Sequence, residues 1–323
     1  MRCLITGVAG FIGSHLAERL LAEGHEVWGI DSFTNYYPRI VKEHNLAGPR
    51  SWERFVFIEK DLLALDLKPL LDGMDWVFHL AAQAGVRASW GQDFDRYNDC
   101  NILATQRLLD ALVDLRCVRR FVYASSSSVY GQAKRLPLKE CMLPQPYSPY
   151  GVTKLAAEHL CMAYHHNEGL PVVALRYFTV YGPRQRPDMA LHRFCKAIVE
   201  QVPLHIFGDG SQTRDFTFVS DIVEANLLAA KATNAIGEVL NIAGGAQTTL
   251  QAVLDLLQEI SGAPLDLIYG QHQRGDVRDT LADTSRAQRL LGYAPQVTLR
   301  EGLTRQFSSI AEVCHLNEPC YKG

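Results

Sequence analysis

The sequence contains no long apolar run, no excess of basic residues and no pattern typical of a secretory leader. No apolar stretch reaches the length that a membrane-spanning helix needs. The net charge of −3 at pH 7 provides no positive field for nucleic acid or for an anionic lipid surface. The first ten residues, "MRCLITGVAG", lack the charged n-region of a signal peptide. We therefore expect a chain with neither a nucleic-acid partner nor a membrane partner.

The cysteines lack any order that would indicate disulfides or a metal. Eight are present, with no CxxC pair and no zinc-ligand spacing. Cys3, Cys117 and Cys161 lie in apolar runs, where a thiol behaves as a small hydrophobic side chain. This pattern indicates a reduced, cytoplasmic protein without a metal site.

The first half of the chain does contain short apolar runs that alternate with amphipathic stretches. The expected strands are "RCLIT", "EVWGI", "RFVFI", "DWVFHLA", "RRFVYA" and "VVALRYF", and the expected helices cover residues 11–23, 94–115 and 149–168. This alternation predicts an α/β fold with a doubly wound parallel sheet of the Rossmann type. After residue 180, proline and glycine accumulate and the rhythm becomes irregular. We therefore expect a Rossmann domain over residues 1–180 and a smaller mixed α/β substrate lobe over residues 181–323, with an interleaved boundary.

A glycine cluster follows the first predicted strand. The segment "TGVAGFIG" places Gly7, Gly10 and Gly13 between that strand and the helix that begins near Phe11. Glycines at such a junction let the backbone turn tightly and approach a pyrophosphate, which then faces the helix N-terminus. Turn glycines occur in any α/β protein, but this position between the first strand and the first helix favours a dinucleotide site.

Acidic residues follow the second and third predicted strands. A carboxylate at Asp31 can accept hydrogen bonds from both hydroxyls of an adenosine ribose and would repel a 2′-phosphate. Asp61 is placed to reach the adenine amino group. Asp31 could instead be a solvated strand end, yet its position after the glycine cluster favours NAD over NADP.

Tyr150 and Lys154 stand four residues apart at the start of the third predicted helix, in "YSPYGVTK". Side chains at this spacing share one face of a helix. An ammonium group near a phenol lowers the pKa of the tyrosine, which can then take a proton from an alcohol as hydride leaves the carbon. A YxxxK pair also arises by chance, so the combination with the glycine cluster is what indicates a catalytic site.

Five segments together resemble one known family. They are "TGVAGFIG", "HLAA" at 79–82, "ASSSSVYG" at 124–131, "YGVTK" and "RYFTVYGP", and they are similar to the extended short-chain dehydrogenases, specifically the NAD-dependent nucleotide-sugar epimerase/dehydratase family. The segments "GVRASWG", "TVYGPRQRPDMA" and "FGDGSQTRDFTFV" further resemble bacterial UDP-glucuronic acid 4-epimerases. The resemblance covers nearly the whole chain.

The resemblance implies a role for individual residues. Ser126 would hydrogen-bond the reacting sugar hydroxyl, Tyr150 would be the general base, and Lys154 would tune that base and bind a ribose. The sugar would pass through a 4-keto intermediate with transient reduction of bound NAD. The residues expected at the NAD site are Gly7, Gly10, Phe11, Ile12, Gly13, Asp31, Asp61, Leu62, Leu80, Ala81, Ala82, Asn101, Tyr150, Lys154 and Tyr177.

The serine run bears on the choice of substrate. Relatives that dehydrate or decarboxylate the sugar usually carry acidic residues just after the catalytic hydroxyl, where this chain has Ser127 and Ser128. Hydroxyls can donate to a substrate carboxylate without adding a like charge, although they could also serve only their own turn. The residues expected to bind the nucleotide sugar are Arg87, Ser127, Ser128, Thr179, Arg186, His205, Phe207, Arg214 and Arg278, with Arg274 competing with Arg278 for the diphosphate.

The prediction is therefore a UDP-glucuronate 4-epimerase. A neutral UDP-hexose 4-epimerase, a UDP-glucuronate decarboxylase and a non-catalytic NAD-binding regulator stay open as alternatives. We also expect a homodimer, because relatives pack the two helices at 94–115 and 149–168 into an intersubunit bundle. The apolar residues at helical spacing are Leu103, Leu108, Leu112, Leu155, Leu160 and Ala163, but helices that face a sheet show the same pattern.

Overall fold

A seven-stranded sheet forms the centre of the molecule in the computed structural model, which describes residues 1–132 and 134–316. Every neighbouring pair of strands is parallel. The sheet order is β11 (Glu238–Ile242), β6 (Val172–Tyr177), β5 (Arg120–Ser126), β4 (Trp76–His79), β1 (Arg2–Thr6), β2 (Glu26–Asp31) and β3 (Phe55–Glu59). The order reverses between β1 and β4, which is where open α/β sheets bind ligands. The predicted fold class is confirmed.

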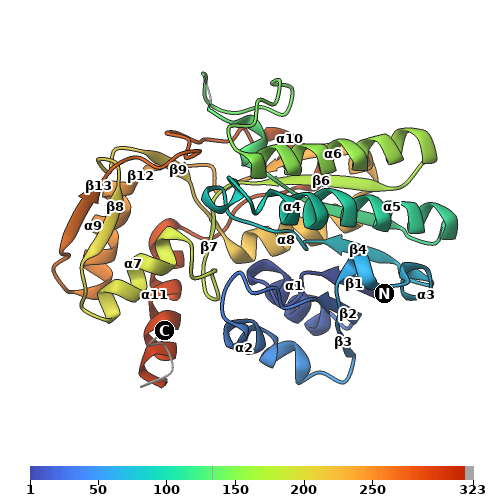
Figure 1. Ribbon diagram of the computed structural model, residues 1–323, viewed down its shortest axis with the longest axis horizontal. Coiled ribbons are helices and arrows are strands. Elements are labelled where there is room, and N and C mark those ends of the chain that lie inside the picture. Colours follow the sequence, from blue (N-terminus) through green and yellow to red (C-terminus); the bar gives the residue numbers. More distant parts are fainter. Residues whose placement is uncertain (133, 317–323) are drawn as a thin grey trace.

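Helices cover both faces of this sheet (Figure 1). One layer contains α1 (Phe11–Ala22), α2 (Arg39–Arg50) and α8 (Val219–Lys231). The opposite layer contains α3 (Leu67–Leu71), α5 (Ala104–Leu115) and α6 (Pro149–Glu168). Each layer contains a large buried cluster, the one beside α1 continuing into residues 191–198 and 253–257, and a smaller third cluster lies around Tyr130 and Phe178. None of the described helices is long and apolar enough to cross a membrane.

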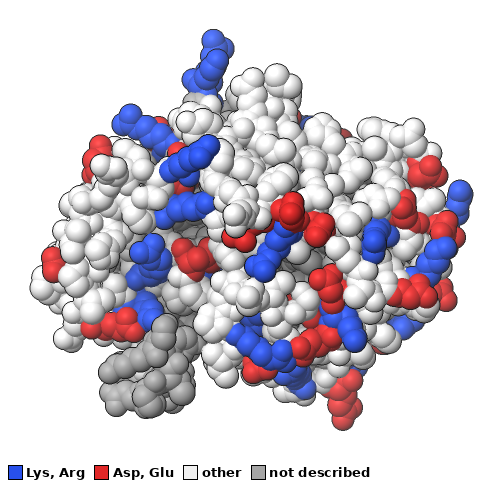
Figure 2. Space-filling view, in the orientation of Figure 1, with Lys and Arg blue, Asp and Glu red and all other residues white. Residues whose placement is uncertain are grey.

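The C-terminal half builds a second, smaller lobe beside the sheet. Its helices are α7 (Ala190–Val199), α9 (Leu250–Ser261) and α11 (Leu299–Leu316), whereas α10 (Ser285–Leu291) packs against β11 and α8 of the sheet domain. Three two-stranded ladders complete it: β8 (Leu204–Phe207) with β13 (Leu267–Gly270), β9 (Thr213–Asp215) with β12 (Gln247–Thr249), and β7 (Val180–Tyr181) with β10 (Thr217–Phe218). On the face shown in Figure 2, Lys and Arg side chains gather where this lobe meets the sheet domain, and the surface there is hollowed.

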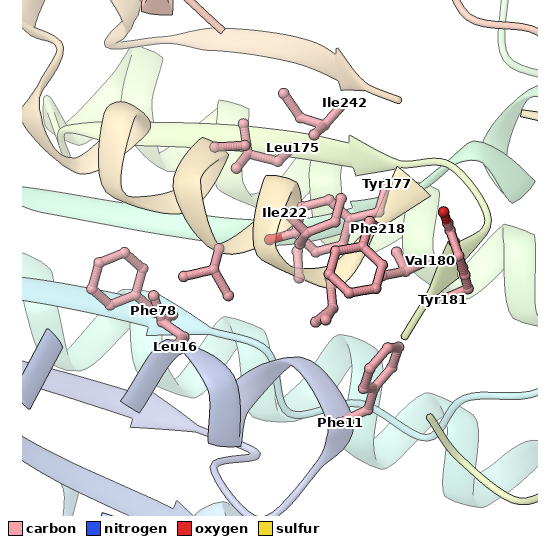
Figure 3. Close-up of a cluster of buried hydrophobic side chains, with 14 of the residues drawn as sticks. Phe11, Leu16, Phe78, Leu175, Tyr177, Val180, Tyr181, Phe218, Ile222 and Ile242 are labelled. Carbon is pink, nitrogen blue, oxygen red and sulfur yellow. The ribbon is translucent and has the colours of Figure 1, made fainter. Parts of the chain in front are cut away.

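The two lobes are interleaved in the sequence. After residue 181 the chain forms α7, β8, β9 and β10 in the smaller lobe and then returns to the sheet with α8 and β11. Figure 3 shows this return, since Ile222 of α8 and Ile242 of β11 lie in one cluster with Leu16, Phe78 and Leu175 of the sheet domain. Residues 317–323, the end of the predicted substrate lobe, lie outside the described residues.

The predicted helix over residues 94–115 is divided into three parts. A short α4 (Phe94–Tyr97) leads into a π-helical turn (Asn98–Leu103), and α5 follows. Short 3₁₀ turns occupy Leu62–Ala64, Arg87–Ser89, Ser127–Tyr130 and Thr233–Ala235. Single π turns inside helices are frequent at functional sites, and this one carries Asn101.

Candidate active site

The glycine cluster forms a tight junction between β1 and α1. Gly7 has a φ of +73°, and a Cβ built there would lie 2.8 Å from the backbone nitrogen of Ala81. A Cβ on Gly13 would lie 2.3 Å from the carbonyl oxygen of Gly7. Gly10 caps α1 without a side-chain hydrogen bond. The N-terminal N–H groups of α1 are therefore presented at the edge of the sheet, where a phosphate fits a helix N-terminus.

A cavity runs from this junction along the carboxyl edges of the strands. It is lined by every residue that the sequence predicts for the dinucleotide except Asn101: Gly7, Gly10, Phe11, Ile12, Gly13, Asp31, Asp61, Leu62, Leu80, Ala81, Ala82, Tyr150, Lys154 and Tyr177. The Tyr177 hydroxyl is already engaged, because it donates to Asn226 (2.9 Å), and Tyr150 also lines the neighbouring cavity. The donor set and the close backbone approach fit a dinucleotide.

Asp31 lines this cavity at the end of β2. Its carboxylate accepts backbone N–H groups from Ala9 (3.1 Å) and Phe33 (2.9 Å). Burial raises the pKa of Asp31, and these hydrogen bonds with the positive charge of Lys42 oppose the rise. Sequence reasoning missed Lys42, whose Nζ donates to the carbonyl (2.6 Å) and the hydroxyl (3.2 Å) of Thr34 at the same cavity. No spacing signal could have found it, because Lys42 reaches the site from α2.

Asn101 has a different place from the predicted one. Its side-chain oxygen accepts the N–H of Gln83 (2.7 Å), and its amide nitrogen donates to the Gln83 carbonyl (3.1 Å) and to the Thr153 hydroxyl (2.9 Å). The side chain is 1% exposed and does not line the cavity. Asn101 thus joins the loop after β4 to α6, and it holds Gln83, which lines the first cavity.

A buried histidine continues this support. The hydroxyl of Thr105 donates to the Asn101 carbonyl and accepts from Nε2 of His79 (2.8 Å). Nδ1 of His79 accepts from the Thr6 hydroxyl (2.7 Å), which itself accepts the N–H of Ala81 (3.1 Å). Each hydroxyl in this chain donates once and accepts once, so the ring is neutral with its proton on Nε2. Burial, and then the charge of Lys154, lowers the pKa of His79 to about 3.

The neutral His79 predicts a loss of stability in acid. An unfolded histidine titrates near pH 6.5, so the unfolded chain binds the extra proton at every pH between the two values. The contribution of the neutral His79 ring to the free energy of unfolding is complete above about pH 6.5, and it falls by about 1.4 kcal/mol for each pH unit below that value. The free energy of unfolding, measured with urea at several pH values from 7.5 to 5.0, should therefore fall less steeply with decreasing pH in His79→Gln than in the parent. Below about pH 6.5 the difference should be about 1.4 kcal/mol per pH unit. His159→Gln, at an exposed position on α6, is the control, and parallel curves for His79→Gln and the parent would contradict the expectation.

Tyr150 lies in the first turn of α6, which Ser148 caps by accepting the N–H of Gly151 (3.1 Å). Burial raises the pKa of the Tyr150 phenol, while the charge of Arg186 and a hydrogen bond from Ser126 lower it. The predicted partner, Lys154, instead donates from Nζ to the carbonyl of Ala124 (2.7 Å), and burial lowers the pKa of Lys154 to about 8. The charge of Arg186, which the sequence places only at the substrate, thus acts on the phenol as well, and the role of Lys154 as its tuner stays a prediction.

The serine run ends β5, and its members have different partners. Ser125 is buried and donates to the carboxylate of Glu158 (2.6 Å). Ser126 accepts the N–H of Ser128 (3.2 Å) and caps the 3₁₀ turn that follows. Within residues 1–132 and 134–316, the hydroxyls of Ser127 and Ser128 have no hydrogen-bond partner, and both residues line the neighbouring cavity. These two hydroxyls are free for a ligand.

This second cavity has a volume of about 550 Å³ and lies between the two lobes. The predicted substrate residues that line it are Arg87, Ser126, Ser127, Ser128, Thr179, Arg186, His205, Phe207 and Arg214. Phe11, Ile12, Tyr36, Tyr150 and Tyr177 line both cavities, so the two are continuous. Sequence reasoning missed Arg193 of α7, which lines this cavity with its guanidinium 5.8 Å from the ring of Phe207.

Arg274 and Arg278 lie outside that cavity. Both line an adjacent hollow on the other side of the 275–277 segment. The guanidinium of Arg274 stacks 3.6 Å from the ring of Trp90, whereas Arg278 is largely exposed beside Asp279. Arg87 reaches the cavity and pairs with Asp276 (2.7 Å) over the ring of Phe207. Among the described residues, the cations that line the cavity near Phe207 are Arg87, Arg193 and Arg214.

Known proteins share both the sequence and the fold. A sequence profile of the NAD dependent epimerase/dehydratase family matches residues 3–243. A protein of Bacillus subtilis (strain 168) that carries the name uncharacterized UDP-glucose epimerase YtcB is 46% identical over 314 residues, which cover 97% of this chain and 99% of that protein. The UDP-glucuronate 4-epimerase of Thermodesulfobacterium geofontis (strain OPF15) is 39% identical over 306 residues, 94% of each chain.

A solved structure agrees with these matches. The UDP-glucuronic acid 4-epimerase from Bacillus cereus, in complex with UDP-glucuronic acid and NAD, superposes with a TM-score of 0.94 at 46% sequence identity. The match covers 97% of this chain and 100% of that one. The glycine junction, the Tyr150–Lys154 helix and the matched length lead to one conclusion: this chain belongs to the NAD dependent epimerase/dehydratase family.

Proposed function

We propose that the protein is a cytoplasmic UDP-glucuronate 4-epimerase that interconverts UDP-glucuronate and UDP-galacturonate. One observation carries the choice of an acidic sugar: two unpaired hydroxyls, Ser127 and Ser128, and the cation Arg186 line the cavity beside Tyr150. Among Ser125–Ser128, where related decarboxylases and dehydratases carry an acid, this chain has none. The serine turn therefore offers a substrate carboxylate donors without a charge of its own. The two acidic residues that line the cavity in the described part of the chain, Asp188 and Asp276, are each paired with an arginine, Arg186 and Arg87.

NAD bound along the first cavity supplies a hydride acceptor and donor at the edge of the sheet. Tyr150, as phenolate, takes the proton of the sugar 4-hydroxyl at its phenolic oxygen, and Ser126 holds that hydroxyl. Arg186 favours the phenolate by its charge. The 4-keto sugar then presents its opposite face, and Tyr150 returns the proton as the inverted alcohol forms. The continuous cavity provides the room for this turn.

The 4-keto form of a uronic acid is a β-keto acid, which loses carbon dioxide readily. An epimerase must hold the carboxylate near the plane of the sugar ring until hydride returns. Ser127, Ser128 and Thr179 supply fixed hydroxyls in this cavity, and all three contact it from strand ends or the 3₁₀ turn. We propose that these contacts suppress decarboxylation.

Single replacements of the free serines test the carboxylate site. Ser127→Ala or Ser128→Ala should each lower kcat/KM for UDP-glucuronate by about 10- to 150-fold, because a hydrogen bond to a charged group contributes about 1.5–3 kcal/mol. Activity on UDP-glucose should change much less, and some UDP-4-keto-pentose should appear beside the epimer. Product analysis by NMR with both sugars measures this. Equal losses on the two sugars without a new product would mean that the serines only shape the turn.

A neutral UDP-hexose 4-epimerase is the second candidate, and the name of the Bacillus subtilis relative favours it. Purified protein incubated with UDP-glucuronate and, separately, with UDP-glucose decides between the two. UDP-galacturonate supports the proposal, UDP-xylose would indicate a decarboxylase, and product from UDP-glucose alone would indicate the neutral epimerase. Retained NAD with no product from either sugar would indicate a non-catalytic NAD-binding protein.

A homodimer through α5 and α6 is part of the proposal. Leu108 and Leu112 do not contribute to it, because both are 0% exposed and face the sheet. The outward side of α6 carries Val152, which is 49% exposed, and Ala163, with Leu103, Leu155 and Leu160 partly buried nearby. Light scattering at micromolar concentration should give a molecular mass of twice the chain mass, and Val152→Glu should lower the measured mass. A monomeric parent protein would refute this part.

A further inference from the structure

The segment 182–189, which carries Arg186 to the cleft, is fixed on both sides. On the side of the smaller lobe, the N–H of Gly182 donates to Gln306 (3.0 Å) and Gln306 donates to Gln185 (2.7 Å). Gln185 in turn donates to the carbonyl of Val180 (2.9 Å). The other side of the segment is held by Arg184, which lies two residues before Arg186.

Arg184 joins the segment to the cofactor-binding half. Its backbone is in the left-handed region, with a φ of +62°, which costs a non-glycine residue free energy unless the surroundings hold it. The guanidinium pairs with both carboxylate oxygens of Glu18 (2.5 and 3.1 Å) and donates to the carbonyl of Asn45 (3.3 Å). Glu18 belongs to α1 and Asn45 to α2, so one side chain fits between both helices.

His15 adds a third contact to this cluster. Arg184 donates to Nδ1 of His15 (3.0 Å), so that nitrogen is an acceptor and the proton lies on Nε2, which donates to the carbonyl of Pro183 (2.9 Å). A proton on Nδ1 would face the guanidinium. Burial first, and the charge of Arg184 second, lowers the pKa of His15 to about 4. The ring therefore stays neutral and holds the segment in place at ordinary pH.

The helix that receives Arg184 is the helix that begins at the glycine junction. Phe11 and Ile12, at the start of α1, line both cavities, and His15 and Glu18 follow within two turns. Two residues further along the segment, Arg186 pairs with Asp188 (3.0 Å), lines the same cavities and acts on Tyr150 by its charge. We propose that Arg184 is a positioning residue that sets the location of Arg186 relative to α1, Tyr150 and the sugar carboxylate.

The inference rests on the proposed function for its choice of sugar. Arg184→Ala should lower kcat/KM for UDP-glucuronate by roughly tenfold or more, the size of a lost hydrogen bond to a charged group, and should affect UDP-glucose much less. In an Arg186→Gln background the same change should have an effect within about twofold, because Arg184 acts through Arg186. The dissociation constants of both sugars, measured by calorimetry, should follow the same pattern. Arg184→Ala should weaken binding of UDP-glucuronate, and it should do so much less in the Arg186→Gln background.

Two further variants separate positioning from folding. A Cβ on Gly48 of α2 would lie 2.0 Å from Oε1 of Glu18, so Gly48→Ala should displace that carboxylate while it favours the helix. It should therefore reproduce part of the selectivity loss without lowering the melting temperature. Arg19→Ala is the control, because Arg19 also joins α1 to a neighbouring helix through Glu224 but is exposed and does not contact the segment. Arg19→Ala should leave both sugars unaffected.

The outcomes distinguish this inference from the proposed function. Additive losses in the Arg184 and Arg186 cycle, or equal losses on both sugars, would make Arg184 a purely structural residue. If the parent protein turns over UDP-glucose only, the proposed function is wrong, and the cycle is read from the pH dependence of kcat on that sugar. Arg184→Ala should then move the limb of the pH profile that reports ionisation of Tyr150 to higher pH, by the same amount as Arg186→Gln does. A limb that stays in place would overturn the inference. The groups around Tyr150 that both variants keep are Asp188, Lys154, Ser126, Tyr36, Tyr97 and Tyr123.

Discussion

Tyr150→Phe is expected to lower turnover of UDP-glucuronate by roughly 10²–10⁴-fold, the range for a positioned acid–base group. The phenolic oxygen is the only atom removed, and it faces Ser126 and Arg186 at the meeting of the two cavities. The ring keeps its edge contact with Tyr97, at 6.3 Å between centroids, so the first turn of α6 should stay in place. NAD and nucleotide binding should therefore be nearly intact.

Tyr164→Phe supplies the matched control. Tyr164 lies on the same helix, and its hydroxyl bonds Asp110 on the outer side of α5, away from both cavities. Stopped-flow turnover, together with calorimetric titration of NAD and UDP, should show the loss in Tyr150→Phe alone. Near-native turnover by Tyr150→Phe would remove Tyr150 from the role of base and with it the proposed mechanism.

Glu158→Gln is expected to lower the free energy of unfolding by about 3–5 kcal/mol, the cost of breaking a buried ion pair by removing one charge. The carboxylate of Glu158 accepts from Nη2 (2.6 Å) and Nε (3.0 Å) of Arg176 and from the Ser125 hydroxyl (2.6 Å). All three residues are at most 4% exposed. The amide would leave the guanidinium buried without a counter-ion and would offer it one oxygen in place of two.

Urea unfolding at pH 7.5 measures this loss, and Glu168→Gln at the exposed end of α6 is the control. The paired change Glu158→Leu with Arg176→Met should be less costly than Glu158→Gln, because it leaves no unpaired charge. A loss below about 1 kcal/mol for Glu158→Gln would mean that water or another anion compensates Arg176.

The sequence was sufficient for the parts of the site that local patterns determine. The glycine junction, the strand-end Asp31 and the bounds of α6 follow from spacing and periodicity along one or two elements. Residues that reach the site from a remote element were missed: Lys42 arrives from α2 and Arg193 from α7. Their positions depend on how helices pack across the sheet, which no local pattern records.

Two assigned residues had other partners for the same reason. Asn101 matched a helix position near the cofactor, but a π turn directs its amide to Gln83 and Thr153. Lys154 has the spacing to reach Tyr150, and the carbonyl of Ala124 in β5 takes one of its three N–H donors. Spacing predicts which side chains share a face, and competition among nearby acceptors decides which of them bond. That competition is visible only in three dimensions.

The interleaving of the two lobes has a consequence during protein synthesis. β6 ends at Tyr177, and its outer neighbour β11 ends at Ile242, 65 residues later. At about 5–20 residues per second, a ribosome needs about 3–13 s to deliver that partner. Throughout this interval the nascent chain carries β6 as an uncovered edge, and the sheet face that α8 later covers is open to water. A nascent chain stalled or cut between these points should associate with chaperones or with its own copies, and a fragment ending at residue 180 should be insoluble.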